Sequence, residues 1–196
     1  ALDSFLARLT AEQIKRISSW SYSHGGHFFV GFDLPDTTVV FDTKTGRWHD
    51  RQSMGAWRAR SCVQAYGEVF VGDSVDGRIG RLDVDVYQEY GNEIIRINST
   101  QPFQNNMQPF RVPHLEMTVE SGVGNDLKEN PVIRLQVSRD GKTFSDERAR
   151  PIGRQGKFGR RAIWRRNGRT DRFDVYRFIM SDPVKPVLLQ LTAKLA

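Results

Sequence analysis

The side chains most able to do chemistry in this sequence are the cations gathered between Arg148 and Arg172. This segment holds ten Lys or Arg and one acid, Asp171, so it carries +9, and the net charge of +6 leaves −3 for the rest of the chain. A localised cationic patch on a slightly acidic body indicates an anionic partner, either phosphate or an acidic protein surface. The candidate interface or DNA-facing residues are Arg148, Arg150, Arg154, Lys157, Arg160, Arg161, Trp164, Arg165, Arg166, Arg169 and Arg172.

Three roles are open for this cationic segment. A contact with DNA would use its phosphates and would weaken steeply with salt. A subunit contact would pair arginine side chains with the carboxylates of a neighbouring chain. A solvated face with no partner is the third role. The slightly acidic remainder of the chain makes the subunit contact the favoured interpretation.

Trp164 lies within the run "RRAIWRR", which reads as a strand. Strand alternation puts Ala162, Trp164 and Arg166 on one face and further arginines with Ile163 on the other. Neither face is cleanly apolar, so the pattern predicts an interface or a phosphate-facing surface for Trp164 instead of a deep core.

Other reactive side chains do not form a recognisable catalytic or metal site. The sequence lacks G-x-S-x-G, Walker and HExxH motifs. His24 and His27 are three apart but have no third ligand nearby, and the aspartates from Asp73 to Asp85 do not have calcium-loop spacing. Cys62 follows the pattern of a small core residue. We therefore expect no catalytic residue, no metal and no cofactor.

A second motif is structural in character. "SRDGKTF", from Ser138 to Phe144, approaches the S-x-D-x-G-x-T-W hairpin of sialidase-like propellers but is one residue shorter at Gly141 and has Phe for Trp. In that motif the aspartate, here Asp140, caps turn amides and the aromatic residue packs below. We expect a tight hairpin here. Trp48 closes another hairpin in "GRWHD", which predicts core packing.

The order of elements predicts an all-β fold with a short N-terminal helix. Thr10 and Gln13 form a capping box that starts a helix at Ala11, and apolar residues from Leu2 to Ile17 predict an amphipathic packing face. The predicted domains are an N-terminal helical segment (1–19), propeller-like β-blades (20–97), a linker (98–114) and a β-sandwich-like C-terminal domain (115–196).

The blade count limits what residues 20–90 can build. At roughly 40 residues per blade they make about two blades, and a propeller needs at least about four. We therefore expect either that this chain is the C-terminal part of a longer protein or that these strands form an open sheet that something else completes. With one cysteine and no apolar run of bilayer length, we also expect a soluble protein made in a reducing compartment.

Five segments in order resemble a known family. They are "GHFFVGFDLPDTTVVFDTKTGRWHDR", "ESGVG", "PVIRLQVSRDGKTFS", "GRQGKFGRRAIWRRNGRTDRF" and "SDPVKPVLL". From His24 to its end, the chain resembles the C-terminal part of the packaged-DNA stabilisation protein of short-tailed phages. The resemblance implies a head-completion or tail-hub protein of the virion, assembled in the host cytoplasm, without a membrane partner.

The same resemblance implies the partners. Copies would form a ring, expected to be six-fold, that contacts the portal or adaptor, the tail needle and the tailspikes, with packaged DNA as a non-specific partner. Two binding alternatives stay open, a carbohydrate-binding β-module of a tail adhesin and a basic nucleic-acid-binding β-domain. A sialidase-like hydrolase fragment is disfavoured because no paired acids stand in a recognisable motif.

Overall fold

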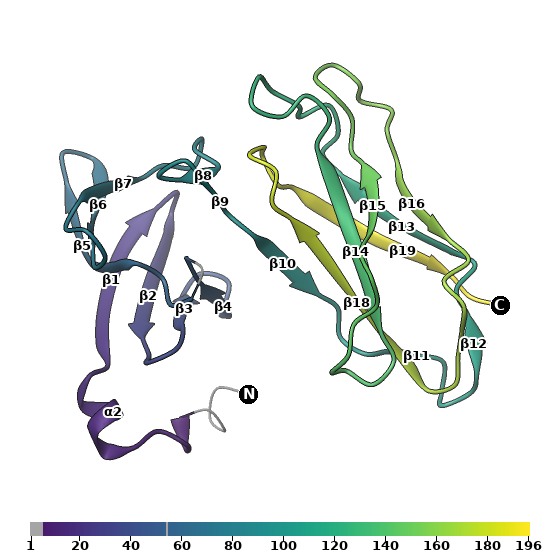
Figure 1. The fold of residues 1–196 in the computed structure, drawn as a ribbon, viewed down its shortest axis with the longest axis horizontal. Helices are drawn as coiled ribbons and strands as arrows, with labels where there is room; N and C mark the ends of the chain where they lie inside the picture. The colour runs from purple at the N-terminus through teal and green to yellow at the C-terminus, as the bar shows by residue number, and fades with distance from the viewer. Residues whose placement is uncertain (1–5, 54) are drawn as a thin grey trace. The chain divides into compact units, whose positions relative to one another are not determined.

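The computed structural model describes residues 6–53 and 55–196 and divides the chain into two compact units, Ala1–Val84 and Asp85–Ala196. Apart from a short helix, α2 (Ala11–Lys15), the regular elements are antiparallel strands (Figure 1). The predicted all-β fold with a short N-terminal helix is therefore confirmed.

The helix begins where its capping box predicts. The Thr10 hydroxyl accepts from the Gln13 amide at 3.2 Å, and the Gln13 side chain accepts from the Thr10 amide at 2.9 Å. The predicted amphipathic face is not seen in α2, which has no buried residue. Five residues make little more than one turn, which is too short for an apolar stripe. Leu2 and Phe5, which belong to the same prediction, lie outside the described residues.

Unit 1 contains two antiparallel sheets. The first has the order β1-β2-β3-β4 and the second the order β5-β6-β7. Their bounds are β1 (Ser18–His24), β2 (His27–Asp33), β3 (Thr38–Asp42), β4 (Arg47–Arg51), β5 (Ala59–Ala65), β6 (Glu68–Asp73) and β7 (Ile79–Leu82). The hairpin between β1 and β2 turns on Gly25 and Gly26, whose φ angles of 57° and 75° suit a two-residue turn with both φ values positive.

One core joins the two sheets of unit 1. Its buried members are Trp20, Tyr22, Val40, Trp57, Ala59, Val69 and Val71. Gly31 is required beneath Trp20, because a Cβ at Gly31 would lie 2.1 Å from the indole ring. The Arg51 guanidinium closes the core edge by lying 4.9 Å from the Trp57 ring centroid and donating to the Tyr22 hydroxyl at 2.5 Å.

Each sheet of unit 1 also has an outer face that carries exposed apolar residues. Trp48 is 51% exposed, which contradicts the core position predicted for it. Its register partner is Phe41, and these two lie on the face opposite Val40, whose side chain belongs to the core. In the second sheet, Val63 and Ile79 are 59% and 78% exposed. The hairpin pattern predicted the strand at Trp48 but not which face is covered.

Unit 2 is a β-sandwich. One sheet has the order β10-β18-β14-β15, with β11 also pairing with β18, and the other has the order β16-β13-β19. Two-stranded ribbons β12-β17 and β8-β9 flank them. The bounds are β8 (Gln88–Glu89), β9 (Asn92–Glu93), β10 (Arg96–Ser99), β11 (Phe103–Gln104), β12 (Phe110–Arg111), β13 (His114–Val119), β14 (Val132–Ser138), β15 (Arg148–Pro151), β16 (Ala162–Arg165), β17 (Arg169–Thr170), β18 (Phe173–Met180) and β19 (Leu188–Lys194).

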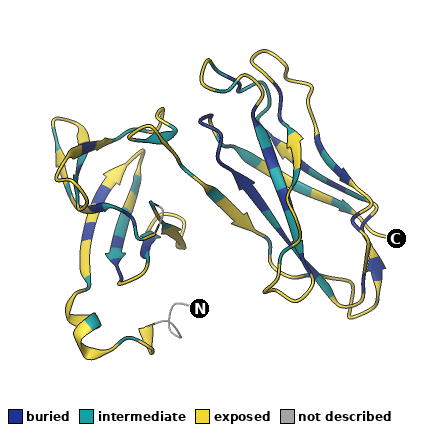
Figure 2. Cartoon of the chain, in the orientation of Figure 1, coloured by how far each residue is buried: buried dark blue, intermediate teal, exposed yellow. Residues whose placement is uncertain are grey.

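The core of unit 2 lies between the two sheets, where alternate residues of β13 and most alternate residues of β14 are buried (Figure 2). Leu115 from β13, Leu135 from β14 and Tyr176 from β18 are all fully buried. Alternation along β13 and β14 buries one face of each strand and leaves the other to solvent, as expected of an antiparallel sandwich.

The segment expected as a linker, 98–114, is part of unit 2. It contains β11 and β12, which pair with β18 and β17, and Phe110 is buried in the core. The Thr100 amide donates to the Tyr176 carbonyl at 2.9 Å. Its Asn-, Gln- and Pro-rich composition is not typical of strands. The two-residue strands β11 and β12 form there because they pair with β18 and β17. The boundary between the units falls at Val84 instead of near residue 97.

Candidate interaction surface at the cationic end of the sandwich

The cationic segment does not form the single patch that its sequence suggests. After β15 the chain leaves as a loop, in which Ile152 accepts from the Gly122 amide and Phe158 accepts from the Ser121 hydroxyl. It then returns along β16 (Figure 1). Arg154, Lys157 and Arg160 lie on this loop, near the end of the sandwich where β18 finishes. Apart from Arg150 and Arg161, which bond within the sandwich, the remaining cations gather at the opposite end.

We call that opposite group the cationic end, located where β18 begins. Its members are Arg111, Arg139, Arg148, Arg165, Arg166, Arg169, Arg172 and Lys194. Three of them, Arg111, Arg139 and Lys194, come from outside the segment that the sequence analysis singled out. No local sequence signal marks them, because strand pairing alone brings them to the others.

Backbone register places like charges side by side. Arg111 pairs directly with Arg169, and His114 on β13 has Arg165 as its partner on one side and Lys194 on the other. Like charges directly opposite each other destabilise a sheet. Arg169 has an ion pair with Asp171 at 3.3 Å. Among residues 6–53 and 55–196, no carboxylate is within ion-pair distance of Arg111, Arg165 or Lys194.

A buried asparagine holds the loop that carries these arginines. Asn167 donates from Nδ2 to the Val112 carbonyl at 2.9 Å and to the Trp164 carbonyl at 3.3 Å. Its Oδ1 accepts from Nη2 of Arg148 at 2.8 Å. Arg166 next to it has a φ of 58°, a left-handed conformation that is uncommon for a residue with a side chain. The backbone of this loop is thus held by several hydrogen bonds at Asn167.

Trp164 is not on the surface, which corrects its predicted interface role. It is fully buried, its ring centroid lies 5.7 Å from that of Phe178, and Nε1 donates to the Arg148 carbonyl at 2.7 Å. Its register partner on β13 is the buried Leu115. The alternation pattern placed Arg166 on the same face as Trp164. This prediction was wrong because β16 ends at Arg165 and the positive φ of Arg166 turns the chain away from the strand direction.

Several of the predicted cations stabilise the sandwich itself. Arg161 donates from Nε to Glu116 at 2.6 Å, and this contact lowers the pKa of Glu116 to about 2. Arg150 links the two sheets by donating from Nε to the Ile163 carbonyl at 2.8 Å. Arg154 lies 3.4 Å from Glu129. These residues have partners within the unit, whereas much of the cationic end does not.

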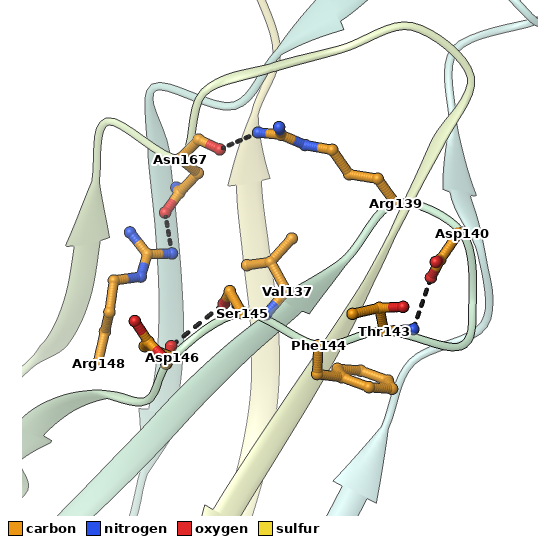
Figure 3. A pocket seen from close by; sticks show the side chains of 9 residues that line it. All are labelled: Val137, Arg139, Asp140, Thr143, Phe144, Ser145, Asp146, Arg148 and Asn167. Carbon is orange, nitrogen blue, oxygen red and sulfur yellow. Dashed lines mark hydrogen bonds between the residues drawn. The ribbon is translucent and has the colours of Figure 1, made fainter.

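A hollow of about 730 Å³ opens at the cationic end (Figure 3). Its lining residues are Val137, Arg139, Asp140, Thr143, Phe144, Ser145, Asp146, Arg148 and Asn167. Arg139 and Arg148 approach Asn167 from opposite sides (Figure 3). The hollow therefore combines two convergent guanidinium groups with apolar surface from Val137 and Phe144.

The motif hairpin forms one wall of this hollow. Asp140 accepts from the Lys142 and Thr143 amides, each at 2.7 Å, and these bonds hold the pKa of Asp140 well below its usual range. Gly141 supplies a positive φ of 75° in the turn. Phe144 is half-buried, and the Arg177 guanidinium lies 3.4 Å from its ring centroid. The hairpin is therefore a capped and rigid wall.

His27 and Asp73, two of the side chains with metal-binding chemistry, have structural partners. Nδ1 of His27 lies 2.8 Å from Asp42, and Arg58 pairs with Asp73 at 2.5 Å. Burial raises the pKa of the Cys62 thiol to about 11, so it is protonated at neutral pH. In the described part of the chain, no group of three His, Cys, Asp or Glu side chains could hold a metal ion. No described helix is long and apolar enough to span a bilayer.

The fold and the site define an all-β protein with two antiparallel units, in which cations gather at one end of unit 2. Family models match both units. Residues 1–87 match "Bacteriophage P22 Gp10, beta-propeller" and residues 89–196 match "Bacteriophage P22 Gp10, beta-sandwich". The chain belongs to this family of phage stabilisation proteins, which are structural components of the phage, and the resemblance noted from the sequence is confirmed.

The other comparisons add little. No curated protein matches the sequence. Among solved structures, the exo-β-1,3-galactanase of Phanerochaete chrysosporium in complex with β-1,3-galactotriose aligns at 8% identity with a TM-score of 0.29. The alignment covers 90% of this chain and 56% of the galactanase. A similarity this low does not indicate a shared activity.

Proposed function

We propose that this protein is a structural component of the phage neck or tail hub that helps to retain packaged DNA and joins the portal side of the head to the tail. Copies assemble into a ring in the host cytoplasm and remain in the virion. The family match over both units supports this function. The portal or adaptor, the tail needle and the tailspikes are the partners that such a position supplies.

The observation that carries the assembly role is the charge left unpaired at the cationic end. Arg165 and Arg166 are exposed and, among the described residues, have no carboxylate partner. Asn167 anchors the backbone of their loop, so the loop itself need not be ordered when a partner binds. Planar guanidinium groups suit the carboxylates of a neighbouring subunit.

A light-scattering experiment tests this function. Wild type and an Arg165→Glu/Arg166→Glu variant are measured at low and high salt, with and without duplex DNA. The matched control, Lys44→Glu/Arg47→Glu, makes the same charge change on exposed residues of unit 1. We expect wild type and control to form an oligomer that salt weakens and that the variant cannot form.

The same experiment also has an outcome that would contradict the subunit contact. A wild type that stays monomeric but binds DNA with a steep salt dependence, lost in the variant, would assign the cationic end to DNA. The carbohydrate-binding alternative receives no support from the hollow, because Phe144 is the aromatic residue among its lining residues and Arg177 occupies a face of that ring.

A further inference from the structure

The hollow at the cationic end contains a charge that the chain does not neutralise. Arg148 is half-buried and, among the described residues, has no carboxylate within ion-pair distance. Burial lowers its pKa, and the neighbouring Arg150 lowers it further. A charge that is partly removed from water is stabilised by an opposite charge nearby. An anionic group from outside unit 2 would supply the missing partner.

The carboxylates nearby do not fill this role. Asp140 is engaged with the amides of its own turn. Asp174, which is buried, accepts from Thr170 at 2.7 Å and from Tyr176 at 3.0 Å, and lies 3.9 Å from Arg139. Asp146 lines the hollow, but no ion pair joins it to Arg148. The space between Arg139 and Arg148 is therefore suited to a carboxylate from another molecule.

The apolar residues that line the hollow favour one class of ligand over another. Val137 and Phe144 contribute carbon surface beside the two arginines. A DNA backbone presents phosphates and sugars and gains little from such a surface. A protein segment that is both acidic and apolar matches charge and hydrophobicity together.

This chain contains a segment of that composition. Residues 83–93, "DVDVYQEYGNE", have four acids and no Lys or Arg. Val84 and Val86 within it are 63% and 54% exposed. The segment includes the β8-β9 hairpin, in which Glu89 pairs with Asn92 around a turn formed by Tyr90 and Gly91.

The turn of this hairpin resembles the turn between β5 and β6, where Tyr66 and Gly67 have φ values of 55° and 80°. Tyr90 has a φ of 51°, a conformation that a bulky side chain rarely adopts and that glycine would adopt without strain. A two-residue hairpin turn with both φ values positive requires this conformation at its first residue, and Gly91 follows with a φ of 86°. The turn places an aromatic side chain at the hairpin tip, with Glu89 and Glu93 beside it.

The hairpin and the hollow lie at opposite ends of unit 2. β18 runs from Phe173, at the cationic end, to Met180. Arg96 pairs with Met180 and donates to the Tyr87 carbonyl at 3.2 Å, which holds the hairpin at that second end. One copy can therefore not fill its own hollow. When two different surfaces of one subunit are complementary, copies associate head to tail. Such a contact forms a closed ring when the rotation between successive copies adds up to a full turn.

We propose that the β8-β9 hairpin of one copy inserts into the hollow of the next, with Tyr90 against Val137 and Phe144 and with Glu89 and Glu93 near Arg139 and Arg148. This contact rests on the proposed assembly of copies and identifies the two surfaces that meet. It accounts together for the absence of a carboxylate partner at Arg148 among the described residues and for the acidic composition of 83–93.

Sedimentation velocity over a wide concentration range tests this contact with charge reversals. The variants are Arg139→Glu, Glu93→Arg and the double variant that carries both. We expect each single variant to weaken self-association at least tenfold and the double variant to recover most of it, because the reversed charges attract again. Arg47→Glu is the matched control and should associate like wild type.

A backbone variant provides an independent test that preserves the fold. Tyr90→Gly relieves the positive-φ strain, so thermal stability should be unchanged or higher, while self-association should fall. If wild type associates but the single reversals have no effect, or if the double variant does not recover, the hairpin contact is wrong and the ring stands. If wild type stays monomeric throughout, the contact and the proposed assembly both fail.

Discussion

The two units of this chain bury their apolar residues and distribute their charge differently. Residues 1–84 contain ten basic and ten acidic residues, whereas residues 85–196 contain nineteen and thirteen, so all of the net +6 belongs to unit 2. Unit 1 keeps apolar side chains on the outer faces of both sheets, as at Trp48 and Ile79. Unit 2 buries its apolar faces against each other.

This difference indicates that the two units are suited to different kinds of contact with other proteins. The outer faces of the sheets in unit 1 carry Trp48, Val63 and Ile79, and exposed apolar residues gathered on a sheet suit it to contact further protein. Unit 2 also exposes apolar residues on its strands, Ile97 on β10 and Leu189 on β19, but it adds an excess of positive charge. Charge is therefore the feature that distinguishes the surface of unit 2, and charge complementarity is a source of specificity.

Truncation of a tryptophan in each unit should give the largest contrast. Trp164→Ala removes a fully buried ring from unit 2, and we expect it to lower the free energy of unfolding by about 3–5 kcal/mol. Trp48→Ala removes a half-exposed ring from unit 1 and should cost less than about 1 kcal/mol. Urea denaturation measures both, and equal costs would contradict the assigned faces.

The buried asparagine of the cationic end should have the next largest effect. Asn167→Ala removes the donors to Val112 and Trp164 and the acceptor of Arg148, so we expect a loss of about 1–3 kcal/mol. Asn98→Ala on the exposed face of β10 is the matched control and should cost little. If Asn167→Ala costs no more than the control, the loop is not anchored as described.

The apolar outer faces of unit 1 allow a prediction about surface chemistry. Val63→Thr/Ile79→Thr keeps β-branched residues in both strands, so the free energy of unfolding should change by less than about 1 kcal/mol. Fluorescence of a dye that binds apolar surface should fall in this variant. Gln190→Thr, on an exposed position of β19 in unit 2, should leave the dye signal unchanged. Equal dye signals in all three proteins would contradict the exposure of these faces.

The smallest effect concerns the ion pair of Arg161 with Glu116. Because the pKa of Glu116 is about 2 in the folded chain and 4.5 is its ordinary value, the charged pair stabilises the fold above about pH 4.5, and this contribution is lost as the pH falls toward 2. Arg161→Gln should therefore be less stable than wild type at pH 7 and equal to it near pH 2. Arg165→Gln is the control, and denaturation across this pH range is the measurement.

Local chemistry was sufficient to predict many elements of the fold. The Thr10 capping box starts α2, and glycine turns place the hairpins at Gly25 and Gly141. These features depend on residues a few positions apart, so their physics is contained in a short segment. The strands within 98–114 escaped prediction because pairs as short as β11 and β12 form only against distant partners.

The sequence by itself determined the strand and turn cadence, the fold class, the family and the excess of cations between Arg148 and Arg172. Only the tertiary structure decided that Trp164 is buried and Trp48 is exposed. The period-2 alternation of a strand separates its residues into two faces but does not predict which face another sheet covers. The tertiary structure also decided that the cations separate into two groups and that Arg111, Arg139 and Lys194 join one of them. That grouping depends on the register of strands far apart in the chain, which no local pattern encodes.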